Sequence, residues 1–140
     1  MGVGKVLVVA LFLVWSVATV NQVFRWSHPL HLWRQAIEAS PDKPRPWNNL
    51  GAHYLLDRSE PFAIDCFQRS TRLAQHPHRS YNELASGISV AQTNLALLEA
   101  QHGEYDQALG RLTPVMNLYK FQETIAAHAW ITRQKIIDSP

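Results

Sequence analysis

An uncharged apolar run near the N-terminus limits what this chain can fold into. From Val6 to Val20 the sequence reads VLVVALFLVWSVATV, in which only Ser16 and Thr19 carry polar side chains. Extended to Phe24, the run covers 19 residues, close to the length that an α-helix needs to cross a bilayer. The sequence therefore predicts a hydrophobic anchor helix in residues 1–26.

Aromatic and basic residues close this run. Phe24 and Trp26 suit the level of the lipid headgroups, and the long side chain of Arg25 can reach those headgroups. The anchor is expected to contact membrane lipid or other hydrophobic helices. Its expected contact residues are Val6, Leu11, Val14, Trp15, Phe24, Arg25 and Trp26.

A cleavable signal peptide is the alternative interpretation of the same segment. Lys5 could serve as its basic region, and Ser16-Val17-Ala18 resembles a small-x-small cleavage site. However, the apolar run continues past that site toward its aromatic and basic edge. This continuation favours an uncleaved anchor.

Composition narrows the class of protein further. The chain has 140 residues, of which 46% are hydrophobic and 17% charged, and these values exclude intrinsic disorder. A net charge of +2 is too small for binding nucleic acid through phosphate neutralisation, so we expect no nucleic-acid partner. The single cysteine, Cys66, permits neither an intramolecular disulfide nor a thiolate zinc site. We therefore expect a fold that is stabilised by packing alone, without cofactor or metal.

Beyond the anchor, apolar residues recur at helical spacing and prolines separate the segments. Leu30, Trp33 and Ile37 share one face of a helix that ends before Pro41. A second helix begins near Pro44, and Ser59-Glu60-Pro61 is predicted to cap a third. The apolar positions of these two helices are Trp47, Leu50, Gly51, Tyr54 and Leu55, then Ala63, Phe67 and Leu73. The pattern predicts two antiparallel helices joined by a short turn.

These residues resemble the tetratricopeptide repeat, a pair of helices 34 residues long. The resemblance is carried by Trp47, Leu50-Gly51, Tyr54, Ala63 and Phe67 in residues 44–79. Residues 27–43 resemble the second helix of a truncated unit, and the residues that carry this resemblance are Trp33, Ala36, Ile37 and Pro41. Residues 80–120 resemble a further unit, and the residues that carry it are Asn94-Leu95-Ala96, Gly103, Tyr105 and Ala108. The resemblance implies an all-α fold, in which a short solenoid of antiparallel helix pairs follows the anchor. Its expected packing residues are Trp33, Trp47, Leu50, Gly51, Tyr54, Ala63, Phe67, Leu95, Tyr105 and Ala108.

The chain departs from this family at several positions. Ser70 replaces a small apolar residue, and Glu99 stands where the later unit should have a tyrosine. The 45 residues from Ala63 to Ala108 exceed the repeat by 11, which is about three helical turns. Because Ser80-Tyr81-Asn82-Glu83 forms a capping box, the sequence predicts one overlong helix from about Tyr81 to His102. Gly87 is its expected weak point, at about 1 kcal/mol relative to alanine.

The last third of the chain completes the predicted array. Pro114 lies inside the second helix of the later unit and is expected to kink or divide it. Residues 121–140 are predicted to form a capping helix that covers the last hydrophobic face of the solenoid. Its expected apolar stripe is Phe121, Ile125, Ala129, Thr132 and Ile136.

The sequence contains no catalytic constellation. It has seven histidines but no HExxH motif, no GxSxG motif and no glycine-rich phosphate loop. His76-Pro77-His78 could bind a metal adventitiously, although a solvated loop is the favoured interpretation. Cys66 lies beside Phe67, where a packed thiol is favoured over a nucleophile. We therefore expect a protein that is not an enzyme.

The family resemblance implies that the first helix of each pair lines a concave groove for a protein or peptide. Asparagine suits such a groove, because its amide can pair with both N–H and C=O of an extended peptide. Alternatively, Asn48 and Asn49 only cap and solvate a helix start. Arg45 is the only cation of the set, which disfavours capture of a terminal carboxylate. The expected groove residues are Arg45, Asn48, Asn49, Ala52, Leu55, Asn94, Leu97 and Gln101.

Three functions fit these features. The first is a membrane-anchored scaffold for protein partners in a bacterial envelope assembly. The second is a structural subunit of a filament or multi-protein complex, such as a homo-oligomer, in which the anchor helix packs in the core. The third rests on RWSHPLHLWRQAIEASPDKPRPWNNLG, which resembles the tail after the last span of bacterial membrane glycan polymerases and glycosyltransferases. That resemblance implies an accessory tail of envelope glycan machinery.

The side of the membrane is indicated by two opposing features. Lys5 precedes the apolar run, whereas Arg25, Arg34, Lys43 and Arg45 follow it, which favours a cytoplasmic repeat domain. A short N-terminal tail before an apolar run instead behaves as a signal anchor, and the envelope resemblance agrees. We expect the repeat domain to be extracytoplasmic, in the periplasm or at the cell surface.

Overall fold

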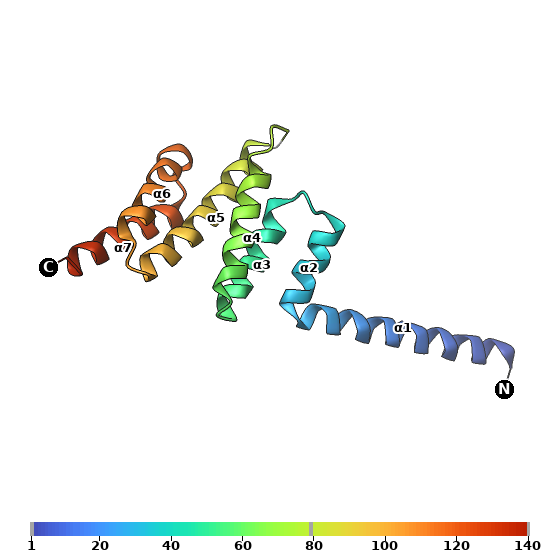
Figure 1. Cartoon of the computed structure of the whole chain (residues 1–140). Helices are drawn as coiled ribbons and strands as arrows, with labels where there is room; N and C mark the ends of the chain where they lie inside the picture. The colour runs from blue at the N-terminus through green and yellow to red at the C-terminus, as the bar shows by residue number, and fades with distance from the viewer. Residues whose placement is uncertain (1, 79, 140) are drawn as a thin grey trace.

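The computed structural model describes residues 2–78 and 80–139, and the side chains of residues 25–27 lie outside the description. Seven helices and no strand occur in these described residues, so the prediction of an all-α fold is confirmed. The helices are α1 (Val3–Ser27), α2 (Pro29–Ala39), α3 (Pro44–Leu56), α4 (Glu60–Ala74), α5 (Tyr81–Gln101), α6 (Tyr105–Tyr119) and α7 (Gln122–Ile137). Figure 1 shows α2–α7 side by side as one array, with α1 leaving it as a separate arm.

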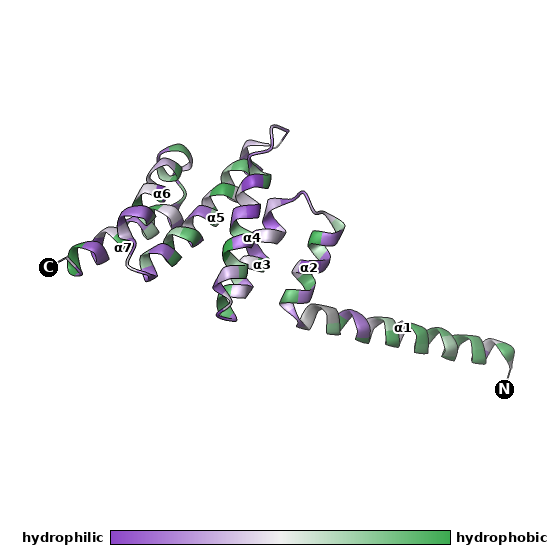
Figure 2. Cartoon of the chain, viewed as in Figure 1, coloured by the Kyte–Doolittle hydropathy of each residue, from purple (hydrophilic) through white to green (hydrophobic). Residues whose placement is uncertain are grey.

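The arm α1 is apolar and uncovered. Its segment Val3–Phe24 is long and apolar enough to cross a membrane, and none of its most apolar stretch is buried. Figure 2 shows hydrophobic residues along most of this helix. The predicted anchor residues that are described are all exposed, namely Val6, Leu11, Val14, Trp15 and Phe24. The side chains of Arg25 and Trp26, also predicted for the anchor, are outside the described part. By length and composition, α1 could anchor the chain in a membrane.

Proline starts the next helices, and aromatic side chains join them. Pro29 and Pro44 each occupy the first turn of a helix, where the fixed proline φ favours helix formation. The Trp47 indole donates a hydrogen bond to the Pro41 carbonyl at 3.1 Å, and the Arg69 guanidinium lies 4.4 Å from its ring centre. Half-buried Trp47 therefore ties the turn between α2 and α3 to α4. Trp33 of α2 is half-buried as well.

Tyr54 also links three helices. Arg34 of α2 donates a hydrogen bond to the Tyr54 hydroxyl at 2.8 Å, and the Phe62 ring of α4 lies 5.4 Å from the Tyr54 ring. The ring of Tyr54 packs on the edge of a core that contains fully buried Ala63 and Phe67. Two of the three aromatic positions predicted for packing in α2 and α3, Trp47 and Tyr54, thus lie at contacts between helices.

The helices α3 and α4 approach closely at Gly51. A Cβ atom at Gly51 would lie 2.8 Å from Phe67 Cε1 and 3.1 Å from Cys66 Cβ. Position 51 therefore needs a residue without a side chain, because any larger residue would displace Phe67 and Cys66 and separate the backbones.

The start of α3 meets the end of α4 and the start of α5 at two small residues. Buried Ser70 donates a hydrogen bond to the Pro44 carbonyl at 3.0 Å, which explains the hydroxyl at a position that the repeat fills with an apolar residue. A Cβ at Gly87 would lie 2.8 Å from the Ala74 Cβ and 3.0 Å from the Pro44 Cβ. Gly87 is therefore more than the weak point that helix propensity indicates, because it lets α5 approach α3 and α4.

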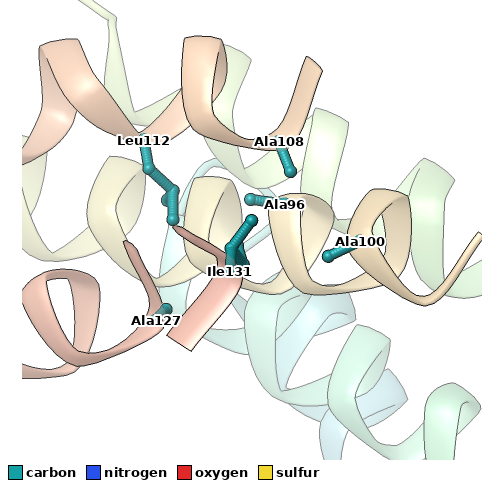
Figure 3. Packing of buried hydrophobic residues seen from close by; sticks show 6 residues of the cluster. All are labelled: Ala96, Ala100, Ala108, Leu112, Ala127 and Ile131. Atoms are coloured by element: carbon teal, nitrogen blue, oxygen red, sulfur yellow. The ribbon is translucent and has the colours of Figure 1, made fainter. Parts of the chain in front are cut away.

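The overlong helix is α5, and its predicted bounds agree with the structure to one residue. The Ser80 hydroxyl accepts a hydrogen bond from the Glu83 N–H, and the Glu83 side chain accepts one from the Ser80 N–H. The helix contacts α3, α4, α6 and α7. Its C-terminal half contributes two alanines to a core with α6 and α7, in which Leu112 and Ile131 point toward the alanines (Figure 3). The members of this core are Ala96, Ala100, Ala108, Leu112, Ala127 and Ile131.

A polar network replaces the tyrosine expected at position 99. Glu99 of α5 accepts hydrogen bonds from Arg111 and Gln107 of α6, and the Arg111 Nε lies 2.9 Å from both carboxylate oxygens. Arg111 also donates to Gln92, which in turn donates to Thr71 of α4. Burial raises the pKa of Glu99, but these hydrogen bonds and the charge of Arg111 outweigh it, so the pKa lies below its ordinary value. The network joins α4, α5 and α6.

Two predictions about α4 and α6 hold only in part. Ser59 is the N-cap residue of α4, as predicted, but its side chain makes no capping hydrogen bond, since its hydroxyl donates to the Asp57 carbonyl at 3.4 Å. Pro114 does not divide α6, which is one helix from Tyr105 to Tyr119. Buried Leu112 and Val115 on either side of the proline hold both parts of α6 in the array. This packing keeps α6 one helix across Pro114.

The stripe predicted for the last helix is also wrong. The residues of α7 that are buried are Thr124, Ala127 and Ile131, and the Thr124 hydroxyl lies 3.0 Å from that of Thr93 on α5. Ile125 and Ile136, by contrast, are 43% and 71% exposed. The helix has two apolar sides, and periodicity alone could not indicate which one the array covers.

Candidate functional site

Two hollows lie along α3 and α5, the first helices of the two pairs. The larger has a volume of about 740 Å³ and lies between the end of α2 and the starts of α3 and α5. The smaller, of about 400 Å³, lies where α3 and α5 end. We call them the start hollow and the end hollow. The start hollow is lined by residues that include Arg45, Asn48, Asn49, Asn82, Glu83, Ser86 and Val90, and the end hollow by Leu55, Arg58, Glu60, Asn94, Leu97, Leu98 and Gln101.

The predicted groove residues divide between these hollows. Arg45, Asn48 and Asn49 line the start hollow. Ala52 is exposed on α3 and lines neither hollow. The remaining four predicted residues line the end hollow, namely Leu55, Asn94, Leu97 and Gln101. The structure thus brings seven of the eight predicted residues to hollows on the first helices.

Asn48 is the most buried polar residue of the start hollow. Its side chain is 4% exposed, and its Nδ2 donates a hydrogen bond to the Gly87 carbonyl at 3.3 Å. Its Oδ1 is buried without a hydrogen-bond partner among the described residues. Asn48 therefore neither caps α3, whose N-cap is Lys43, nor lies in solvent. A buried acceptor without a partner costs about 1 to 3 kcal/mol.

An ion pair at the start hollow was not predicted. Lys43, just before α3, lies 2.9 Å from Glu83 in the first turn of α5. The hydrogen bond from Lys43 is the largest effect that holds the pKa of Glu83 below its ordinary value. The capping box marks Glu83 as a residue of a helix start, but a partner 40 positions away leaves no signal in helical spacing.

The end hollow carries charges of both signs, and neither was predicted for it. Arg58 follows α3 with a positive φ of 55° and makes no ion pair among the described residues. Glu60 lies 3.0 Å from the His102 ring nitrogen. With Arg58, the groove residues include a second cation besides Arg45, at the opposite end of α3. The positive φ is unusual for a residue with a side chain and could not be read from the local sequence.

The structure offers little for metal or thiol chemistry. No group of three or more metal-ligating side chains occurs in residues 2–78 and 80–139. Cys66 is buried against Gly51, and burial is the main cause that raises the pKa of its thiol to about 11. At neutral pH the thiol is therefore protonated, as expected for a packing residue.

Comparison with known proteins identified no similar protein. No protein-family model, curated protein or solved structure matches the chain.

Proposed function

We propose that this chain is a membrane-anchored scaffold that binds a peptide segment of a protein partner, by the arrangement of the tetratricopeptide repeat. The observation that carries the proposal is the position of the two hollows. Both lie along the first helices α3 and α5, which are the groove helices of that family, and together they contain seven of the eight residues predicted for a groove.

The dimensions of α3 suit a short extended peptide. Arg45 and Leu55 are ten residues apart, so they are separated by about 15 Å along the helix axis. About five residues of extended chain cover this length. Asn94 and Gln101 can pair with both the N–H and the C=O groups of a peptide at the end hollow. A contact of this size supports modest affinity.

Helix α1 and the cellular location of the array are the second part of this function. We propose that α1 crosses the membrane and that the array lies in the periplasm or at the cell surface of a bacterium. The support is the apolar, uncovered α1 and the resemblance of residues 25–51 to tails of envelope glycan enzymes. A tether raises the local concentration of the hollows, which compensates for a small contact.

Peptide display on the full-length chain in detergent tests the scaffold proposal. We expect selected peptides to bind the wild type and to lose about tenfold or more in affinity to Asn94→Ala/Gln101→Ala, since two hydrogen bonds are worth about 1 to 3 kcal/mol. The matched control is Asn117→Ala/Gln122→Ala, which removes the same two side-chain types from exposed positions outside both hollows. Equal affinity of the two double variants for every selected peptide would contradict the proposal.

A second candidate function is a structural subunit whose α1 packs among other copies. The observation that favours it is that α1 is apolar on all sides and uncovered along its length, so that neighbouring helices could replace lipid. Electron microscopy of the native material distinguishes the two functions. Regular polymers with α1 in their core favour the subunit, and separate particles in membrane favour the scaffold.

A further inference from the structure

Helix α7 holds the place of a first helix in the array. It contacts α5 and α6, just as α5 contacts α3 and α4. The side that carries Thr124, Ala127 and Ile131 is buried in these contacts. The opposite side of α7 is exposed in the described chain.

This exposed side carries three apolar residues. Ile125 and Ile136, which are 43% and 71% exposed, lie with the exposed Ala129 within about 40° of one another around the helix axis. We call these three residues the outer face of α7, and Trp130, which is 44% exposed, lies about 100° from Ala129 and outside this face. Outside α1 and α7, the large apolar side chains exposed to a similar degree are scattered over four helices, at Leu56, Phe62, Tyr81, Val90 and Leu118. Exposed apolar residues that share one helix face, as Ile125, Ala129 and Ile136 do, are candidates for an interaction site.

We propose that a second copy of this chain covers the outer face of α7, with the two α7 helices antiparallel about a two-fold axis near Ala129. Small Ala129 at the centre allows the helices to approach, and the larger Ile125 and Ile136 lie toward the ends of the contact. A two-fold contact uses the same face on both copies, which is the commonest arrangement of protein dimers.

The charges on α7 complement each other in this arrangement. An antiparallel pair centred on residue 129 places Glu123 level with residue 135 of the other copy, which is about 3 Å along the axis from Arg133. Glu123 and Arg133 are exposed, and neither has an ion pair among the described residues. Lys135 is already paired with Asp106 of the same chain. Two symmetric Glu123–Arg133 pairs would therefore lie within the contact, between the two-fold axis and Ile136, which favours a second copy over an unrelated helix.

The contact leaves the rest of the molecule available. Figure 1 shows α1 and α7 at opposite ends of the chain, and no residue of α7 lines either hollow. A dimer would present two pairs of hollows to one partner, which raises avidity without new contacts.

Disulfide formation in the full-length chain tests the dimer. In a Cys66→Ala background, Ala129→Cys places one thiol at the proposed two-fold axis. We expect oxidation in detergent to link two copies at least about tenfold faster than in the matched variant Gly110→Cys, because the dimer holds the residue-129 thiols at a high effective concentration. Gly110 is exposed on α6 with open space around it, so it reports chance collisions within a shared micelle.

A second substitution tests whether the disulfide linkage depends on the outer face of α7. Adding Ile136→Asp to the Ala129→Cys variant should reduce its rate to that of Gly110→Cys, whereas adding Leu56→Asp, at a residue 77% exposed on α3, should leave it unchanged. Helicity by circular dichroism checks that each variant is folded. Equal rates at positions 129 and 110, or linkage that survives Ile136→Asp, overturns the proposal. Light scattering of the wild type that shows oligomers of increasing size, instead of a dimer, would also overturn the proposal, because an open series indicates a head-to-tail contact.

Discussion

The two longest helices, α1 and α5, have opposite environments. α1 has 25 residues, is apolar almost throughout and has no buried residue in its membrane-length segment. α5 has 21 residues, carries polar side chains such as Gln92 and Glu99, and contributes nine buried residues. The more hydrophobic helix is thus the uncovered one.

This contrast shows that the neighbours of a helix, more than its own hydrophobicity, decide its burial. Four helices of the same chain cover α5, and they do so through glycine, alanine and serine at the contacts. What covers α1 must come from outside the described array, either as lipid or as other chains. A change in α1 should therefore affect attachment, and a change beside α5 should affect the stability of the array.

The largest effect is expected from Leu11→Arg in α1. An arginine at the centre of a spanning helix costs about 3 kcal/mol of insertion free energy. We expect the variant to be lost from the membrane fraction, while the array keeps its melting temperature. Leu56→Arg, at an exposed position of α3, is the control and should remain in the membrane. If the Leu11→Arg variant stays in the membrane fraction, the prediction that α1 anchors the chain in the membrane is contradicted.

A smaller effect is expected where α3 and α4 approach each other. Gly51→Leu must displace Phe67 and Cys66, which should lower the free energy of unfolding by about 1 to 3 kcal/mol. Gly110→Leu, at a helical position with open space, should have little effect. Denaturant titration of both variants measures the difference, and equal stability would show that the helices do not approach at Gly51.

Alanine substitutions should have effects of opposite sign at two helical glycines. Gly87→Ala gains about 1 kcal/mol of helix propensity, but its Cβ would lie 2.8 Å from that of Ala74, so we expect net destabilisation. Gly110→Ala gains the same propensity without a contact and should stabilise by up to about 1 kcal/mol. The melting temperatures of Gly87→Ala and Gly110→Ala, each compared with that of the wild type, test this prediction. Stabilisation by Gly87→Ala would mean that α5 is more loosely covered than the structure indicates.

The smallest effect concerns pH. The pKa of Glu99 in the folded chain lies below its ordinary value of 4.5, because the hydrogen bonds and charge of Arg111 outweigh burial. The unfolded chain therefore takes up this proton first as the pH falls, and the stability that Glu99 contributes above pH 4.5 is lost as the pH falls through the folded pKa. Glu99→Gln should flatten the acid side of the pH–stability curve. Glu38→Gln, at an exposed residue without an ion pair among the described ones, is the control. An unchanged acid limb in Glu99→Gln would contradict the pairing.

Features set by neighbouring residues were predictable from the sequence. The apolar run specified α1, and the capping box with its following stripe specified α5 to within one residue. Proline starts and short turns specified the helix pairs. In each case the signal and the structure that it produces lie within a few residues of each other.

Features that depend on distant residues were not predictable. Asn48 and Ser70 are buried because they bond to the carbonyls of Gly87 and Pro44, which lie 39 and 26 positions away. The burial of Asn48 makes it part of the wall of the start hollow, whereas the sequence suggested an accessible amide. The side of α7 that is covered depended likewise on α5 and α6, because both of its sides are apolar.

The central position of α5 has a consequence for how the array unfolds. In repeat proteins each unit touches only its neighbours, so that the ends can fray while the middle persists. Here one helix contacts both the pair before it and the two helices after it, and the network from Thr71 through Gln92 to Arg111 crosses it. Separating either end therefore exposes part of the same helix. α3–α7 should behave as a single cooperative unit, with the slowest amide hydrogen exchange in the middle of α5.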